Sequence, residues 1–286
     1  VVMRVPMIIQ WLRAARADSA RRGVCLIYAR TIAVAQTGWV VLALAPLTLW
    51  PSVTLALLLI SVEIVGPVLV SRRHGGTPWH PHHIAERYGL LVIIALGEGL
   101  LGTMAALSTL FDASGWSVDF VLVGLAGVGL TFGIWWSYFL FPSGDLLHHH
   151  RARSPIWGNG HIPLLIAVVA VGGGLHLAAY SLGGEATLSP TATILAVAVP
   201  VAAYIVLVYV LFGALTRALR PMHWWMLAGS MALTVTAVGF VAAGGAMPVG
   251  LIVVAAVPWV TVVGQEIEAF RHERESPVAS RESVGT

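Results

Sequence analysis

The stretch IAERYGLLVIIALGEGLLGTMAAL, residues 84–107, decides which class of protein this sequence encodes. Its only charged residues are Glu86, Arg87 and Glu98. A helix of this length, rising about 1.5 Å per residue, crosses the hydrocarbon core of a bilayer, which is about 30 Å thick. We therefore predict a transmembrane helix here.

The composition of the whole chain agrees with a membrane protein. Of the 286 residues, 58% are apolar and 10% are charged, whereas soluble domains are about 45–50% apolar and about 25% charged. The formal net charge of +3 does not indicate nucleic-acid binding. The single cysteine, Cys25, excludes a disulfide within the chain. These figures exclude a soluble domain of this size.

Seven further apolar runs have lengths suited to crossing a bilayer. They cover residues 24–44, 53–70, 118–141, 163–182, 191–214, 222–243 and 248–264. The sequence therefore predicts an all-α fold, a polytopic transmembrane bundle of about eight spans.

The arginines indicate which side of the membrane each loop faces. Apart from Arg30 and Arg87, which lie near span ends on the same side, they lie before the first predicted span and after the second, fourth, sixth and eighth, whereas the alternate loops contain none. Loops rich in arginine stay in the cytoplasm. We therefore predict that both termini of this chain are cytoplasmic.

This topology divides the chain into three parts. Residues 1–23 form a partial or interfacial helix with a basic cytoplasmic stretch, and residues 24–264 form the transmembrane bundle. Residues 265–286 form a charged cytoplasmic tail, which we expect to be disordered beyond about Glu275.

Two carboxylates fall deep inside predicted spans, where each costs about 2.5–3.5 kcal/mol near the bilayer centre on insertion scales. Glu63 lies in the second span and Glu98 in the third, and His176 lies in the fifth. Counting from the span ends places all three at similar depths. If they also meet laterally, such a cluster suits proton relay or cation binding. The alternative is that each polar group bonds a neighbouring helix and only holds the bundle together.

The third span begins with a second polar group. His83 and Arg87 lie on one face of its first turns, with Glu86 beside them. Arg87 and Glu98 are eleven residues apart, which places them within about 20° on the helix wheel. A polar stripe from the cytoplasmic mouth to Glu98 would suit a water-filled path. The alternative is an ordinary interfacial pair of Glu86 and Arg87.

Glycines recur in three spans, beside Glu98, at Gly129 and Gly133, and in the run 172–174. Close helix packing explains them, and the run 172–174 is also compatible with a hinge or broken helix.

Histidines gather in the predicted cytoplasmic loops, at His74, His80, His82 and His83 and at His148, His149 and His150. No cysteine or carboxylate accompanies them at the spacing of a metal site. The chain also contains no motif of a nucleophilic, phosphate-binding or zinc-protease site. We predict no metal site, no cofactor and no enzyme activity, although a membrane enzyme that uses the loop histidines stays open as an alternative.

Four stretches resemble one known family. They are His83-x-x-Glu86-Arg87-x-Gly89-Leu90 followed by Ile93-Ile94-x-Leu96-Gly97-Glu98, then Glu63-x-x-Gly66-Pro67, Trp135-Trp136-x-Tyr138-Phe139, and Gly160-His161-x-Pro163-Leu164. Together they are similar to the bacterial low temperature requirement protein A family of multi-span membrane proteins. The family's acidic and aromatic N-terminal motif has no counterpart here, and Leu140 stands where members often carry Asp.

The resemblance implies a bacterial inner-membrane location and favours His83, Glu86, Arg87, Glu98 and Glu63 as site residues. Our leading hypothesis is a proton- or cation-linked transporter or channel whose site residues are these five and His176. The alternative is a structural or lipid-interacting membrane protein that supports membrane function in the cold. The expected partners are the lipid bilayer and a small ion or proton, and no nucleic acid.

Overall fold

The computed structural model describes residues 1–74, 79–184, 188–217 and 219–275, of which 71–74, 269 and 271–275 are described by their backbone only. Within this part of the chain there are helices and no strand, which confirms the all-α prediction. Eight helical segments are long and apolar enough to cross a membrane, which confirms the predicted number of spans. The chain is therefore a multi-pass membrane protein.

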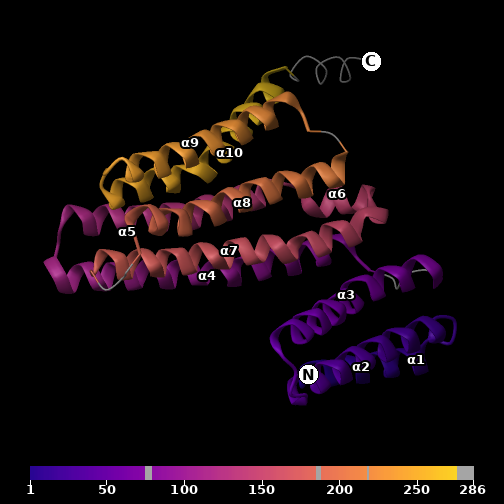
Figure 1. Cartoon of the computed structure of the whole chain (residues 1–286). Helices are drawn as coiled ribbons and strands as arrows, with labels where there is room; N and C mark the ends of the chain where they lie inside the picture. Colours follow the sequence, from indigo (N-terminus) through magenta and orange to yellow (C-terminus); the bar gives the residue numbers. More distant parts are fainter. Residues whose placement is uncertain (75–78, 185–187, 218, 276–286) are drawn as a thin grey trace, which may run out of the picture. The chain divides into compact units, whose positions relative to one another are not determined.

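The chain forms two compact units, Val1–His80 and Pro81–Thr286. The first unit contains α1 (Arg4–Ala17), α2 (Arg22–Leu44) and α3 (Leu49–His74). In it, α2 packs against both α1 and α3. These three helices are coloured indigo to purple in Figure 1.

Aromatic and polar contacts hold the first unit together. The ring of Trp11 in α1 stacks on that of Tyr28 in α2, with centroids 4.6 Å apart. The Tyr28 hydroxyl donates to the carbonyl oxygen of Pro67 in α3 at 3.3 Å. In the loop between α1 and α2, Arg21 donates to the Asp18 carboxylate at 2.8 Å, and this bond lowers the pKa of Asp18 below its ordinary value.

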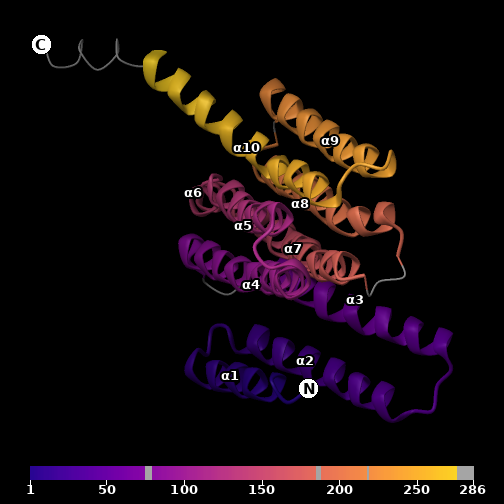
Figure 2. The same ribbon diagram turned by 90° about the vertical axis from the view of Figure 1, so that its left-hand side faces the viewer.

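The second unit is a bundle of two layers. Its elements are α4 (Pro81–Ser114), α5 (Val118–Phe139), α6 (Ser143–His149), η1 (Arg151–Arg153), α7 (Ser154–Leu182), α8 (Pro190–Thr216), α9 (Pro221–Ala242) and α10 (Met247–Glu275). One layer is the row α4, α5, α10, and the other is the row α7, α8, α9, as Figures 1 and 2 show. The main contacts between the rows join α4 to α7 and α10 to α9.

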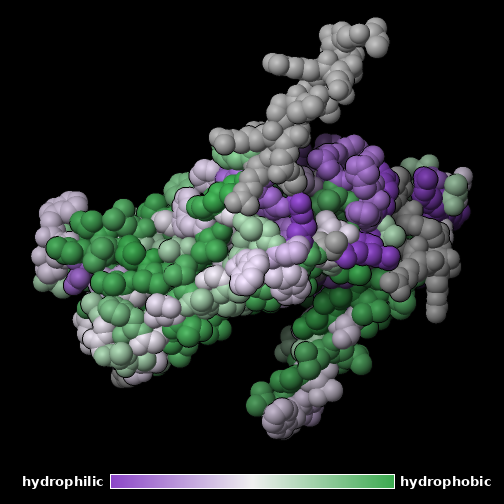
Figure 3. All heavy atoms as spheres, turned by 90° about the horizontal axis from the view of Figure 1, so that it is seen from above, coloured by the Kyte–Doolittle hydropathy of each residue, from purple (hydrophilic) through white to green (hydrophobic). Residues whose placement is uncertain are grey.

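The helix ends that the arginines predict to be cytoplasmic lie together at one end of this bundle. We call this end the arginine end. There Arg153 at the start of α7 donates to the Ala214 carbonyl at the end of α8, and Arg220 before α9 pairs with Glu268 in α10. Figure 3 shows hydrophobic side chains along most of the unit's length and hydrophilic ones gathered toward one end. The sidedness of this end stays a prediction.

Hydrogen bonds satisfy polar groups inside the bundle. The Tyr204 hydroxyl in α8 is fully buried and donates to the Ile134 carbonyl in α5 at 2.8 Å. The Trp259 indole N–H in α10 donates to the Gly129 carbonyl in α5 at 2.9 Å. Because lipid offers no hydrogen-bond partners, such bonds are the way a buried polar group is accommodated.

Glycines set the closest helix approach, between α4 and α7. A Cβ atom on Gly172 would lie 2.5 Å from the carbonyl carbon of Glu98, and one on Gly102 would lie 2.6 Å from the carbonyl oxygen of Gly172. A Cβ on Gly173 would meet open space. Since α7 is continuous from Ser154 to Leu182, these glycines serve close packing, and the helix is not broken there.

Three other glycines differ in what their Cβ atoms would contact. A Cβ on Gly133 would lie 2.7 Å from Pro258 in α10, whereas Gly129 and Gly97 face open space. Gly133 therefore allows α5 and α10 to approach, and Gly97 has no packing role.

The last helix is longer than the predicted span 248–264. It begins at Met247 and continues to Glu275, so the first part of the predicted tail is helical. The disorder predicted beyond Glu275 concerns residues 276–286, which lie outside the described residues.

We expect Gly172→Ala to destabilise the protein by about 1–3 kcal/mol, because the new methyl group must displace the α4 backbone. Thermal unfolding in detergent measures this. Gly173→Ala is the matched control on the same helix and should leave the midpoint unchanged or raise it, because alanine favours helix. Equal effects of the two changes would contradict the proposed close approach.

We expect both ends of the chain to face the cytoplasm, since arginine-rich segments are retained there. A green fluorescent protein fused after Thr286 should fluoresce in cells, and alkaline phosphatase at the same place should be inactive. The opposite pattern would reverse the predicted topology.

Candidate functional site

Glu63 lies in α3 of the first unit and is half-buried. Its carboxylate oxygen Oε1 accepts a hydrogen bond from Nε2 of Gln36 in α2 at 2.7 Å, and Gln36 is 8% exposed. Pro67, four residues after Glu63, lies within the same helix and has no N–H to donate to the Glu63 carbonyl. The sequence reasoning found the acid but missed Gln36, an uncharged polar residue within the first predicted span.

Glu63 also lines an open hollow of about 370 Å³, together with Gln36, Trp39 and Arg4. No ion pair joins Arg4 to Glu63 among the pairs seen in the described part of the chain. A carboxylate held by an amide, in a hollow, offers oxygen atoms to a small cation or a proton.

Glu98 lies in the middle of α4, and its side chain is exposed. Its backbone lies against Gly172 of α7 at the close approach described above. Among the described residues, no side chain hydrogen-bonds to or pairs with this carboxylate. An unpaired carboxylate halfway along a membrane helix is costly, which is typical of a functional residue.

His176 also lies at the α4–α7 contact. Its Nδ1 donates to the Gly172 carbonyl at 3.1 Å, and a Cβ on Gly102 of α4 would lie 3.1 Å from that nitrogen. Glu98 and His176 therefore flank one crossing of two helices, which we call the α4–α7 seam. Glu63 belongs to the other unit, and its predicted meeting with Glu98 stays a prediction.

The remaining predicted residues lie on the first turns of α4. His83, Glu86 and Arg87 are all exposed, and Nδ1 of His83 lies 3.4 Å from Oε2 of Glu86. This places a charged group at the arginine end of the helix that also contains Glu98.

Beside these residues, three of the quoted motifs meet in one cluster. The Tyr88 ring contacts the rings of Trp157 and His161, with centroids 4.9 Å and 4.6 Å away. The Tyr138 hydroxyl lies 2.9 Å from Nε2 of His161. We call Tyr88, Tyr138, Trp157 and His161 the Tyr–His cluster; it joins α4, α5 and α7.

The hydrogen bonds of His161 assign its tautomer. Nδ1 lies 2.8 Å from the Trp157 carbonyl oxygen, which can only accept, so Nδ1 holds the ring proton. In the neutral ring Nε2 is then the acceptor, and the Tyr138 hydroxyl donates to it. His161 is 1% exposed, so this geometry keeps both ring nitrogens satisfied without water.

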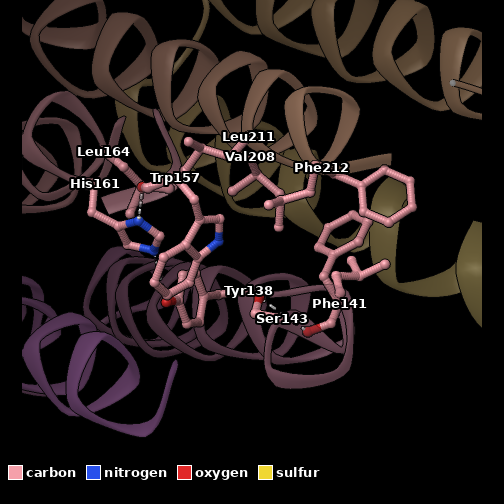
Figure 4. A pocket seen from close by; sticks show the side chains of 11 residues that line it. Tyr138, Phe141, Ser143, Trp157, His161, Leu164, Val208, Leu211 and Phe212 are labelled. Carbon is pink, nitrogen blue, oxygen red and sulfur yellow. Dashed lines mark hydrogen bonds between the residues drawn. The ribbon is translucent and has the colours of Figure 1, made fainter. Parts of the chain in front are cut away.

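A small chamber adjoins the cluster, as Figure 4 shows: His161 and Trp157 line one side of it, and Phe141 and Phe212 line the other. Its volume is about 20 Å³, room for a single water molecule. Tyr138, Phe141 and Ser143 separate it from a hollow of about 220 Å³ that His82 and Glu86 also line.

Tyr138 lines both the chamber and this hollow. Its hydroxyl bonds His161, so the two side chains form a hydrogen-bonded pair at the edge of the hollow. The sequence reasoning quoted Tyr138 and His161 in motifs but did not name them as site residues. Their positions inside apolar spans were the available signal.

Tyr138→Phe should destabilise the protein by about 0.5–1.5 kcal/mol, because it removes the hydroxyl that satisfies His161 and keeps the ring. Unfolding in detergent measures this change. Tyr180→Phe is the control: Tyr180 is 53% exposed and has no hydrogen-bond partner among the described residues. Equal effects would show that the bond to His161 contributes nothing.

Comparison with known proteins gives one family match. The family model for the bacterial low temperature requirement A protein (LtrA) matches residues 1–258. No curated protein and no solved structure matched the chain. The matched region includes α4, α5 and α7 and hence the Tyr–His cluster and the α4–α7 seam. With a match over most of its length, the chain belongs to the bacterial low temperature requirement A (LtrA) family.

Proposed function

We propose that this protein is a proton- or cation-linked transporter or channel of the bacterial inner membrane. The observation that supports this best is the α4–α7 seam, where Glu98, with no described partner, and His176 flank one glycine-lined crossing. A carboxylate and an imidazole at membrane depth are typical of proton and ion pathways.

Two further features fit the same function. The Gln36–Glu63 pair lines a hollow in the first unit, and it supplies a second carboxylate at membrane depth. His83, Glu86 and Arg87 lie exposed at the arginine end of α4, where they attract or repel ions before these reach Glu98. The proposal involves no catalytic step, no cofactor and no metal.

The second candidate function is a structural or lipid-interacting role in the cold. The observation that favours it is that Glu63 is bonded to Gln36 on the next helix, as a residue that only holds the bundle would be. On this view neutral replacements of the acids preserve function, and only changes at close contacts such as Gly172 impair it.

Proton flux into liposomes containing the purified protein distinguishes the two functions. A potassium gradient together with valinomycin imposes a membrane potential on the vesicles. A pH-sensitive dye inside them should then report the proton flux that this potential drives. We expect Glu98→Gln to lower the rate by about tenfold or more, equivalent to about 1.4 kcal/mol in the barrier. His176→Gln should lower the rate in the same direction.

Asp112→Asn is the matched control, because it removes one carboxylate from the exposed end of the same helix. It should leave the flux unchanged. A folded wild-type protein without flux under proton, sodium and potassium gradients would overturn the transport proposal. Full flux in folded Glu98→Gln and Glu63→Gln proteins would do the same.

A further inference from the structure

A second polar line enters the bundle along α10, away from the seam and the Tyr–His cluster. Thr261, Gln265 and Glu268 are spaced by four and three residues, so they lie on one face of the helix. We call these three residues the α10 stripe. The predicted end of the last span at residue 264 had placed two of them in the tail.

The outer end of the α10 stripe is an ion pair. The Glu268 carboxylate in α10 pairs with the Arg220 guanidinium beside the start of α9. The Glu268 side chain is 16% exposed and that of Arg220 is 55% exposed. The carboxylate is therefore largely inside the protein, while the guanidinium reaches water.

The inner end of the α10 stripe is a hydroxyl pair. Thr261 is fully buried, and the Tyr209 hydroxyl of α8 donates to its Oγ1 at 3.2 Å or to the Met226 sulfur of α9 at 3.2 Å. The stripe thus runs from the surface at Glu268 to hydroxyls inside the contact of α8, α9 and α10.

Between these ends, Gln265 has an amide nitrogen with no partner. Its Nε2 is buried and makes no hydrogen bond, the only side-chain atom in this state within the described part of the chain. A buried donor without an acceptor indicates a missing water or ion. Because Nε2–H groups donate, the occupant must accept hydrogen bonds, which a water molecule does and a bare cation does not.

We propose that the α10 stripe is a hydrated proton-binding site, with Glu268 as the group that takes the proton. Water occupies the space beside Gln265 Nε2 and connects Glu268 to the Tyr209 and Thr261 hydroxyls. The ligand is a proton delivered by water from the arginine end. This inference goes beyond the proposed transport at the seam, since it uses none of the seam residues.

Charged and titratable groups of the neighbouring helices surround Glu268, the proposed proton acceptor. Arg220, directly before α9, pairs with Glu268, and His223 of α9 and Tyr209 of α8 lie near enough to interact with its charge. His223 accepts the Arg220 backbone N–H at Nδ1, so its neutral ring holds a proton on Nε2. On proton binding, an O–H bond of hydronium breaks, one forms on Glu268, water is left, and Arg220 loses its counter-charge.

Cysteine accessibility tests whether the α10 stripe is hydrated. Replacing the only cysteine, Cys25→Ala, gives a background for Gln265→Cys, probed with a membrane-impermeant charged methanethiosulfonate reagent. Such reagents react with thiolates, which form in water and not in lipid. We expect Gln265→Cys to react about tenfold or more faster than Val263→Cys, since Val263 lies on the outer face of α10 and is 53% exposed.

Infrared difference spectra between acid and neutral pH test the proton acceptor. Glu268→Gln should remove one protonated-carboxyl band, and Glu268→Asp should keep a shifted band. Glu266→Gln is the matched control, two residues away on α10 and unpaired among the described residues, and it should keep the band that Glu268→Gln removes. These readouts do not depend on flux, so the transport proposal can fail while this one stands.

Two results would overturn the inference. Equal reactivity of Gln265→Cys and Val263→Cys would show a dry stripe. Identical carboxyl bands in wild-type and folded Glu268→Gln proteins would show that Glu268 does not bind the proton.

Discussion

The second unit depends on the close contact of α4 with α7 at Gly102 and Gly172. In lipid, helices gain little from burying apolar surface against one another, so van der Waals contact and short polar bonds must hold them. Small residues allow the backbones to approach, and the approach brings mid-helix groups of both helices to one crossing. Glu98, His176 and three members of the Tyr–His cluster, Tyr88, Trp157 and His161, lie along these two helices, so their positions follow from this contact.

The same constraint explains the polar chemistry of the bundle. Lipid tails supply no hydrogen-bond partners to groups inside the bundle. Hydroxyl and indole groups therefore donate to helix carbonyls, as those of Tyr204 and Trp259 do. Groups that depart from this pattern stand out. Glu98 has no described partner and Gln265 has an unpaired donor, and both lie where a water or a proton would complete the set.

Much of the fold could be predicted because hydrophobic length is a strong signal. Eight apolar runs became eight helical segments that are long and apolar enough to cross a membrane, whereas the sidedness read from the arginines stays a prediction. The end of α10 was missed because Gln265, Glu266 and Glu268 resemble a soluble tail, although Arg220 of the neighbouring helix offsets the cost of Glu268. The Tyr–His cluster was missed as a unit because helices far apart in sequence create it. Depth along a helix can be counted, but the direction that a side chain faces depends on packing.

The glycines of α7 also limit how this protein can move. Gly172 lies against the α4 backbone, and Gly174 lies against the backbone of α8 around Ala196, so α7 is wedged between two neighbours through two of its glycines. Rotation about its own axis would bring side chains with a Cβ into both contacts at once. Sliding along the axis would also move the two glycines out of these contacts, so α7 is held both in rotation and in register, and the heights of His161 and His176 along the bundle are fixed with it.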